Sequence, residues 1–258
     1  MCGIFSLLNP EQGTDYISDF KKGSKRGPEE TSYEKINDSL IFGFHRLAIN
    51  GLTNESGQPL KKKDCILICN GEIYNHNYLY SLLSETPNTK SDCEVIIDLY
   101  KRYGIRETLD LLDGVFAFVL YDETLHELFI ARDPYGVRPL YIGGKDYIKD
   151  NGTKVMMMAF SSELKMITNH VDTVTQFRPG HYMICSMEDN NYWCLDSTYP
   201  YITGYQIDRN IDNVHQLISS SLIQAVKKRV ENTERPIACL LSGGLDSSLI
   251  TSPVCTLS

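Results

Sequence analysis

The chain opens with Met1-Cys2-Gly3, which places a thiol at the second position. Methionine is commonly removed before a small second residue, and this trimming would leave Cys2 with a free α-amine beside its own thiol. A free thiol has a pKa of about 8.5 and reacts as the thiolate, while an α-amine titrates near roughly 7.7–8.0. One residue would then carry both a nucleophile and its base. By itself a Met-Cys start is an ordinary initiator dipeptide, so its meaning depends on the residues that follow.

Composition and charge describe an ordinary globular chain. Its 258 residues suffice for one large domain, or for one domain and part of another. Hydrophobic residues make up 42% of the sequence and charged residues 22%, as in soluble proteins generally. The net charge of −8, without a basic stripe, argues against nucleic acid as a partner. No apolar run reaches the about 18 residues that span a bilayer, so no membrane partner is expected.

Eight cysteines are scattered along the chain without a CxxC pair. This spacing argues against a zinc site and against a disulfide framework. We therefore expect no metal site, reduced thiols and a cytoplasmic protein.

Apolar runs predict a series of strands with helices grouped between them. Strands are expected over residues 2–8, 65–69, 115–121, 125–131, 139–142, 154–161 and 181–186. Helices are expected over residues 74–83, 95–103 and 106–112. Because strands and helices do not alternate strictly, the pattern indicates an α+β fold with antiparallel sheets.

Three shorter stretches carry local expectations. Asn70-Gly71-Glu72 is expected to form the turn that ends the strand at 65–69. Ser91 and Glu94 have the spacing of a capping box at a helix start. The three lysines at 61–63 are expected in a solvated loop.

The last part of the chain changes character. A polar, turn-rich segment at 196–210 is interpreted as a linker, and an amphipathic helix is predicted over 211–230. Residues 236–241 are predicted to form a buried strand that leads into Ser-Gly-Gly-Leu-Asp-Ser-Ser at 242–248. Glycines let backbone N–H groups approach an anion, serine hydroxyls donate, and a following helix start adds positive charge. The stretch therefore predicts a phosphate-binding loop, although it lacks the lysine of a Walker A loop.

The loop at 242–248 resembles the pyrophosphate-binding loop of enzymes that adenylate a carboxylate or carbonyl group with ATP. The resemblance implies ATP contacts at Leu241, Ser242, Gly243, Gly244, Asp246 and Ser247.

Seven further stretches follow one another in the order seen in one family. They lie at 2–5, 44–49, 70–76, 91–94, 113–118, 132–140 and 177–182. Through them, residues 2–195 resemble the class II glutamine amidotransferase domain, and with the loop at 242–248 the chain resembles glutamine-hydrolysing asparagine synthetases. The resemblance implies an N-terminal-nucleophile hydrolase fold, a four-layer αββα sandwich with antiparallel sheets. It implies a glutaminase domain at 1–195, a linker at 196–210, and the truncated start of an α/β adenylating domain at 211–258.

The resemblance assigns the chemistry to Cys2, whose thiol would attack the side-chain amide carbon of glutamine. Its α-amine, through a water, would take the thiol proton and later give it to the departing ammonia. Water would then hydrolyse the thioester to glutamate. The tetrahedral oxyanion would be held by the Asn70 side-chain amide and the Gly71 backbone N–H.

The two charged ends of glutamine need partners of opposite sign. Arg46 offers a planar fork for the α-carboxylate, and the carboxylates of Glu72 and Asp92 are candidates for the α-ammonium. Backbone contacts with the substrate are implied at Leu47, Ala48, Ile49 and Asn50. Each charged residue also has a structural alternative, since Arg46 could form a surface ion pair and Glu72 could be a turn residue. Asp92 could simply be an acid favoured in a first helical turn.

Cofactors are implied for one half only. The glutaminase half needs none, whereas the synthetase half would use ATP with Mg²⁺ and aspartate, forming β-aspartyl-AMP that ammonia attacks. These partners apply only if the synthetase domain is completed, because one strand and one or two helices cannot cover both faces of a parallel sheet.

One motif departs from the family, and three interpretations remain open. The early loop reads Lys25-Arg26-Gly27-Pro28-Glu29 where the family usually has His-Arg-Gly-Pro-Asp, so its detail is in doubt. The chain could be the front of an asparagine synthetase, a free-standing glutaminase subunit that delivers ammonia to another chain, or a non-catalytic interaction protein. The loop at 242–248 favours the first, and the intact glutaminase residues argue against the third. A homodimer and a complementing synthetase chain both stay open as partners.

Overall fold

Two units make up the chain, Met1–Ile202 and Thr203–Ser258. The computed structural model describes residues 1–194, 198–201 and 213–257. Among these residues, the first unit contains two antiparallel sheets and the second contains two helices.

One sheet has the strand order β10-β8-β9-β1-β3-β2. Its strands are β1 (Gly3–Leu8), β2 (Glu30–Asn37), β3 (Leu40–Arg46), β8 (Tyr141–Ile148), β9 (Lys154–Ser161) and β10 (Thr173–Gln176). β1 pairs with β3 on one side and β9 on the other, and all of its residues are buried. Cys2 therefore directly precedes a central strand.

The other sheet has the order β12-β11-β7-β6-β5-β4, and β13 also pairs with β11. Its strands are β4 (Leu60–Lys62), β5 (Cys65–Ile73), β6 (Gly114–Asp122), β7 (Glu127–Arg132), β11 (His181–Glu188), β12 (Asn191–Cys194) and β13 (Tyr199–Pro200). The long β5–β6 pair runs in unbroken register from one end to the other.

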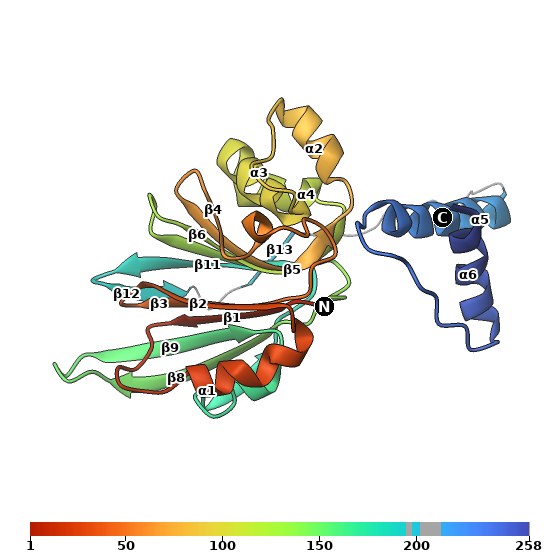
Figure 1. Cartoon of the computed structure of the whole chain (residues 1–258). Helices are drawn as coiled ribbons and strands as arrows, with labels where there is room; N and C mark the ends of the chain where they lie inside the picture. Colours follow the sequence, from red (N-terminus) through yellow and green to blue (C-terminus); the bar gives the residue numbers. More distant parts are fainter. Residues whose placement is uncertain (195–197, 202–212, 258) are drawn as a thin grey trace. The chain divides into compact units, whose positions relative to one another are not determined.

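Helices cover the outer faces of both sheets. The α-helices of this unit are α1 (Ile17–Phe20), α2 (His76–Leu83), α3 (Val95–Tyr103) and α4 (Ile105–Leu111). The 3-10 helices are η1 (Lys21–Arg26), η2 (Asn54–Ser56), η3 (Asp92–Glu94) and η4 (Leu164–Met166). Figure 1 shows α2, α3 and α4 on the side of β4, β5 and β6, and α1 on the side of β1, β8 and β9.

Alternation of side chains along β1 explains the layers. Ile4 and Leu8 pack into the core between the two sheets, whereas Phe5 and Leu7 pack on the opposite face with residues of α1 and η4. On β5, Ile68 enters the core between the sheets, and Leu67 on the other face packs with residues of α3. The predicted α+β sandwich with antiparallel sheets is therefore confirmed.

Some boundaries differ from the prediction. Asn70-Gly71-Glu72 was expected as a turn, but these residues continue β5 and pair with β6. Local turn propensity is outweighed here by a complete ladder of strand pairing. β2 was not predicted, because its mostly half-exposed, polar residues lack an apolar run. β8 begins at Tyr141 and extends to Ile148, beyond the predicted 139–142.

The expectations for Ser91 and for the lysines at 61–63 are wrong in part. Ser91 makes no side-chain cap, and the Glu94 carboxylate instead accepts hydrogen bonds from the backbone N–H groups of Asn88 and Thr89. Lys62 ends β4 and its ammonium is buried, 2.5 Å from a Glu94 oxygen. Buried carboxylates pair with the Lys62 ammonium, and this pairing explains why Lys62 does not lie in the solvated loop expected for all three lysines.

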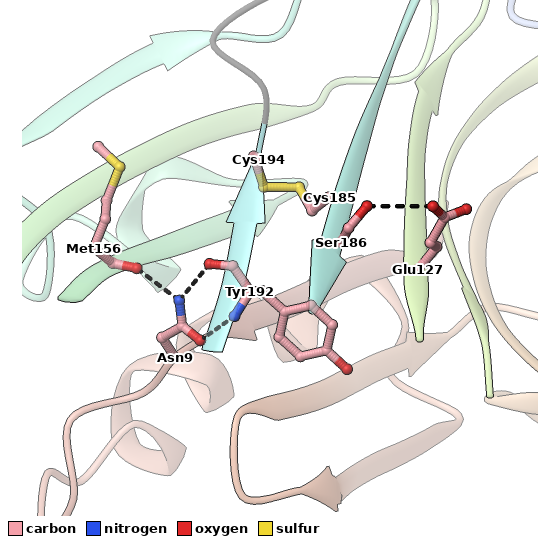
Figure 2. The surroundings of a disulfide bond; sticks show 7 residues. All are labelled: Asn9, Glu127, Met156, Cys185, Ser186, Tyr192 and Cys194. Carbon is pink, nitrogen blue, oxygen red and sulfur yellow. Dashed lines mark hydrogen bonds between the residues drawn. A yellow bond between two sulfur atoms is a disulfide. The ribbon is translucent and has the colours of Figure 1, made fainter. Parts of the chain in front are cut away.

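The expectation of reduced thiols is wrong for one pair. Cys185 of β11 and Cys194 of β12 lie opposite each other in the ladder and form a disulfide, as Figure 2 shows. Sequence spacing alone could not place them on adjacent strands. The other six cysteines are free.

Beside this disulfide, the Asn9 side chain joins the two sheets. Its amide donates to the Met156 carbonyl at 2.9 Å and to the Tyr192 carbonyl at 2.8 Å, and its oxygen accepts from the Tyr192 N–H at 2.8 Å. Figure 2 shows these bonds from Asn9, which follows β1, to Met156 of β9 and Tyr192 of β12. They anchor the end of β1 that lies away from Cys2.

The second unit contains α5 (Val214–Glu231) and α6 (Leu245–Leu257), which contact each other. The start of the predicted helix at 211–212 lies outside the described residues, as do 196–197 and 202–210 of the predicted linker. The predicted buried strand at 236–241 is wrong, since these residues are irregular and Leu240 is 97% exposed. A strand needs pairing partners, and the described part of this unit provides none.

Across the described residues, each helix is either too short or too polar to serve as a membrane span.

Candidate active site

One end of the sandwich holds a cavity of about 40 Å³ that starts at Cys2. All ten glutaminase residues predicted from the sequence line it, namely Cys2, Arg46, Leu47, Ala48, Ile49, Asn50, Asn70, Gly71, Glu72 and Asp92. The other lining residues are Met1, Phe44, Ser56, Gln58, Cys69, Ser91, Cys93 and Arg138. The ten predicted residues come from four separate stretches: the N-terminus, the end of β3 with the loop after it, the end of β5, and η3.

Backbone contacts hold Cys2 in this cavity. Its Sγ lies 3.4 Å from both the N–H and the carbonyl oxygen of Leu47, and its own carbonyl accepts a hydrogen bond from Arg26 Nε at 2.8 Å. Burial raises the pKa of the Cys2 thiol, and burial also lowers the pKa of the Met1 α-amine beside it. The raised pKa favours the neutral thiol, so attack by this sulfur requires a base.

Asn70 presents a buried donor with no partner. Its side chain lies at the end of β5, is 1% exposed, and its Nδ2 makes no hydrogen bond. An unpaired buried donor costs about 1–3 kcal/mol, and native structures keep few of them. An N–H donor in the wall of the cavity that Cys2 also lines can stabilise a negatively charged oxygen.

The neighbouring residue must be a glycine. A Cβ built on Gly71 would lie 2.9 Å from Phe116 Cβ, 2.9 Å from the Val115 oxygen and 3.0 Å from Cys69 Sγ. β6 therefore packs against this part of β5 too closely for a side chain. The glycine keeps the backbone at the cavity wall in register.

Arg46 is a buried cation at the end of β3. One terminal nitrogen lies 3.0 Å from a Glu30 oxygen, and the other donates to the carbonyls of Gly51 and Thr53. The structural alternative foreseen for Arg46, an ion pair, is therefore present, although the guanidinium is buried rather than on the surface.

The two candidate carboxylates differ in their surroundings. Glu72 forms an ion pair with Arg138. Asp92 is buried and accepts a hydrogen bond from the Ile73 N–H at 2.7 Å. Burial raises the pKa of Asp92 in spite of that bond. A cationic ligand group would relieve this cost of burying a carboxylate.

Sequence reasoning assigned no role to several residues that position the site. Arg26 and Arg138 stood inside recognised motifs, and charged residues within those motifs were the available signal. Glu29 accepts a hydrogen bond from the Ala48 N–H at 2.9 Å, and Gln58 bonds to both the N–H and the carbonyl of Cys69. No local signal marks Gln58, because its contact depends on how the loop after η2 packs against β5.

The stretch predicted to bind phosphate lies at the start of α6 in the second unit. Residues 242–244 precede the helix, and residues 245–248 form its first turn. Gly243 has a φ of +81°, and a Cβ built on it would meet nothing within 4 Å. The Ser242 and Ser247 hydroxyls lie 3.0 Å apart, and the Ser248 hydroxyl donates to the Gly244 carbonyl at 2.8 Å. The loop is exposed and open, and it leads directly into a helix start, which suits an anion.

Among the described residues, no group of three or more His, Cys, Asp or Glu side chains is arranged to hold a metal ion.

Comparison with protein families gives two matches. The glutamine amidotransferase domain family matches residues 1–192, and the asparagine synthase family matches residues 217–254. The human protein "Asparagine synthetase [glutamine-hydrolyzing]" is 35% identical over 282 residues, which cover 98% of this chain and 48% of that protein. The "Probable asparagine synthetase [glutamine-hydrolyzing]" of Acanthamoeba polyphaga mimivirus is 36% identical, with 98% and 49% covered. The chain thus spans about half the length of these relatives.

Solved structures share the fold. The glutamine phosphoribosylpyrophosphate amidotransferase from B. subtilis matches with a TM-score of 0.58 at 19% identity, over 99% of this chain and 64% of that one. This likeness supports the architecture of two antiparallel sheets with outer helices. Because the family match at residues 1–192 covers well over half of the sequence, this chain belongs to the family of glutamine amidotransferase domains.

Proposed function

We propose that this chain hydrolyses glutamine at Cys2 to glutamate and ammonia, as the glutaminase part of an asparagine synthetase. The observation that carries the proposal is the meeting of Cys2, Arg46, Asn70, Glu72 and Asp92 in one cavity. Binding and hydrolysis of an amino-acid amide require a nucleophile, an oxyanion donor, a cation for the α-carboxylate and carboxylates for the α-ammonium. These residues supply each of those groups.

The reaction follows from these positions. With Met1 removed, the α-amine of Cys2 takes the thiol proton, and the thiolate attacks the side-chain amide carbon of glutamine. Asn70 Nδ2 and the Gly71 N–H hold the oxyanion. Collapse of the tetrahedral intermediate breaks the C–N bond, and the protonated amine gives its proton to the leaving ammonia. Water then attacks the thioester, the amine accepts its proton, and glutamate leaves.

Substrate orientation comes from the charged groups. Arg46 pairs with the α-carboxylate of glutamine, and Glu72 and Asp92 pair with its α-ammonium. The backbone of residues 47–50 contacts the substrate between these ends. The raised pKa of Asp92 falls toward its usual range when an ammonium group arrives, so binding and ionisation of this carboxyl support each other.

In this proposal, the ammonia released at Cys2 amidates aspartate in a synthetase domain. The asparagine synthase match at 217–254 favours this over a free-standing glutaminase that feeds another chain. We assign residues 1–195 to the glutaminase, 196–210 to a linker and 211–258 to the start of the synthetase domain. ATP with Mg²⁺ would supply activation of aspartate, and the backbone of 241–247 would hold its phosphates. The cytoplasmic localisation stays a prediction, which the Cys185–Cys194 disulfide does not favour.

A glutaminase assay tests the proposal. The chain with Met1 removed is expected to release glutamate and ammonia, and Cys2→Ala or retention of Met1 should abolish the release. Cys239→Ala is the matched control, because Cys239 is free, exposed and in the second unit. A trimmed wild-type chain without glutaminase activity, or a fully active Cys2→Ala variant, would refute the proposed function.

A further inference from the structure

The guanidinium of Arg46 already has a carboxylate partner. Glu30 of β2 and Arg46 of β3 lie directly opposite each other in the ladder, and Glu30 Oε2 accepts a hydrogen bond from Arg46 at 3.0 Å. The other terminal nitrogen donates to the carbonyls of Gly51 and Thr53. A substrate carboxylate that approaches Arg46 therefore meets a guanidinium whose end is occupied.

The two partners differ in burial. The Arg46 side chain is 8% exposed and the Glu30 side chain is 43% exposed. A buried cation is costly unless it is paired, so an empty site needs an anion against Arg46. Glu30 can return to water at little cost, because much of its side chain is already solvated. When the pair separates, the Glu30 side chain therefore moves into water and Arg46 stays buried.

The site is also small, although Glu30 is not among the residues that line it. The cavity of about 40 Å³ is far smaller than the roughly 300 Å³ at the lower end of small-molecule sites. Lining groups must move before an amino acid fits. The Glu30 carboxylate lies against the loop after η2, where a Cβ built on Gly57 would be 3.1 Å from Glu30 Oε1. Because residue 57 is a glycine, no side chain at this position fills the space beside the Glu30 carboxylate.

From this arrangement we infer that Glu30 is an internal competitor for the α-carboxylate of glutamine on Arg46. It neutralises the buried guanidinium in the empty site and is displaced when the substrate binds. Glu30 therefore sets the affinity for substrates with a free α-carboxylate. The inference rests on the proposed function, because it takes glutamine as the ligand of Arg46.

Steady-state kinetics of Glu30→Gln test the inference. Glutamine keeps the shape of the side chain and removes its charge, so the KM for glutamine is expected to fall about two- to fivefold with kcat unchanged. Glu30→Asp shortens the reach to Arg46 and should change KM in the same direction. Glu34→Gln is the matched control, since Glu34 lies on the same strand and its carboxylate pairs with Lys61 at 2.6 Å. This variant should leave KM unchanged.

The α-amide of glutamine provides a second arm. It lacks the negative charge that competes with Glu30, so its KM should not fall in Glu30→Gln. An unchanged or raised KM for glutamine in both Glu30 variants, or an equal fall for the α-amide, overturns the inference while wild-type hydrolysis stands. A wild-type chain that hydrolyses no glutamine instead overturns the proposed function, and the inference about Glu30 falls with it.

Discussion

Asn70 combines burial with an unpaired side-chain donor, and this combination makes it the sharpest test of the oxyanion pocket. Asn70→Ala should lower kcat by about 10²–10³ while KM for glutamine changes little, because the donor acts on charge that develops in the transition state. The free energy of unfolding should not fall much, since the removed donor had no partner. Kinetics and chemical denaturation measure the two effects.

The matched control for Asn70 is Asn77→Ala on the exposed side of α2. It should leave kcat and KM as in the wild type. An Asn70→Ala variant that keeps its kcat would contradict the oxyanion role.

Asp92 links stability to pH. Burial raises the pKa of its carboxyl above the usual value, so the folded chain holds this proton more tightly than the unfolded chain does. The contribution to stability is therefore lost as pH rises from about 3.9 through the raised native pKa, and the cost persists at neutral pH. Asp92→Asn should make the chain more stable at pH 7, with less gain at pH 4.

The same substitution should raise KM for glutamine roughly 10- to 100-fold, because a charged hydrogen bond to the ammonium group is lost. Denaturant midpoints at the two pH values and steady-state kinetics check both effects. An Asp92→Asn variant that is less stable at pH 7, with unchanged KM, would rule this account out.

Sequence reasoning identified the chemical groups of the site but not their partners. Cys2, Asn70 and Asp92 stand in recognisable motifs, and all three line the cavity. The pairing of Arg46 with Glu30 depends on the register of β2, a strand whose polar residues carry no apolar signal. Charge partners set by strand register are hidden from local patterns.

A buried ion cluster holds η3, which carries Asp92, against β4. The Lys62 ammonium lies 2.5 Å from a Glu94 oxygen and 2.8 Å from an Asp98 oxygen, and all three side chains are nearly inaccessible. Lys62→Met leaves two buried carboxylates with less compensation, so the free energy of unfolding should fall by about 3–5 kcal/mol. Urea denaturation of the purified variant gives this number.

Lys61→Met is the adjacent control, because Lys61 forms an exposed pair with Glu34 that is worth about 0–1 kcal/mol. Equal losses of unfolding free energy in Lys62→Met and Lys61→Met would show that the buried cluster stabilises the fold no more than the exposed pair does.

Strands with a buried apolar face could be predicted from the sequence. Strands of polar residues, and apolar runs without a strand to pair with, were not predicted correctly. β9 has the bounds predicted from its apolar run, because its alternating residues enter two separate cores. Residues 236–241 have a strand-like composition, yet the described part of their unit offers no strand to pair with. An apolar run predicts burial only where other elements supply the layer that buries it.

At the scale of the whole molecule, the candidate active site and the predicted phosphate loop fall in different units. Every residue that lines the cavity at Cys2 belongs to the first unit, whereas the phosphate-loop residues belong to the second. The asparagine synthase match covers only 38 residues, 217–254, of a chain that spans about half of its relatives. The proposed glutamine hydrolysis therefore draws on residues of the first unit.

The most direct measurement is mass analysis of the full chain, trimmed of Met1, after rapid acid quenching during turnover with glutamine. The account predicts a glutamyl adduct on the peptide that begins with Cys2, and its absence in Cys2→Ala. Release of glutamate without any adduct on Cys2, and at the same rate in Cys2→Ala, would contradict the central claim.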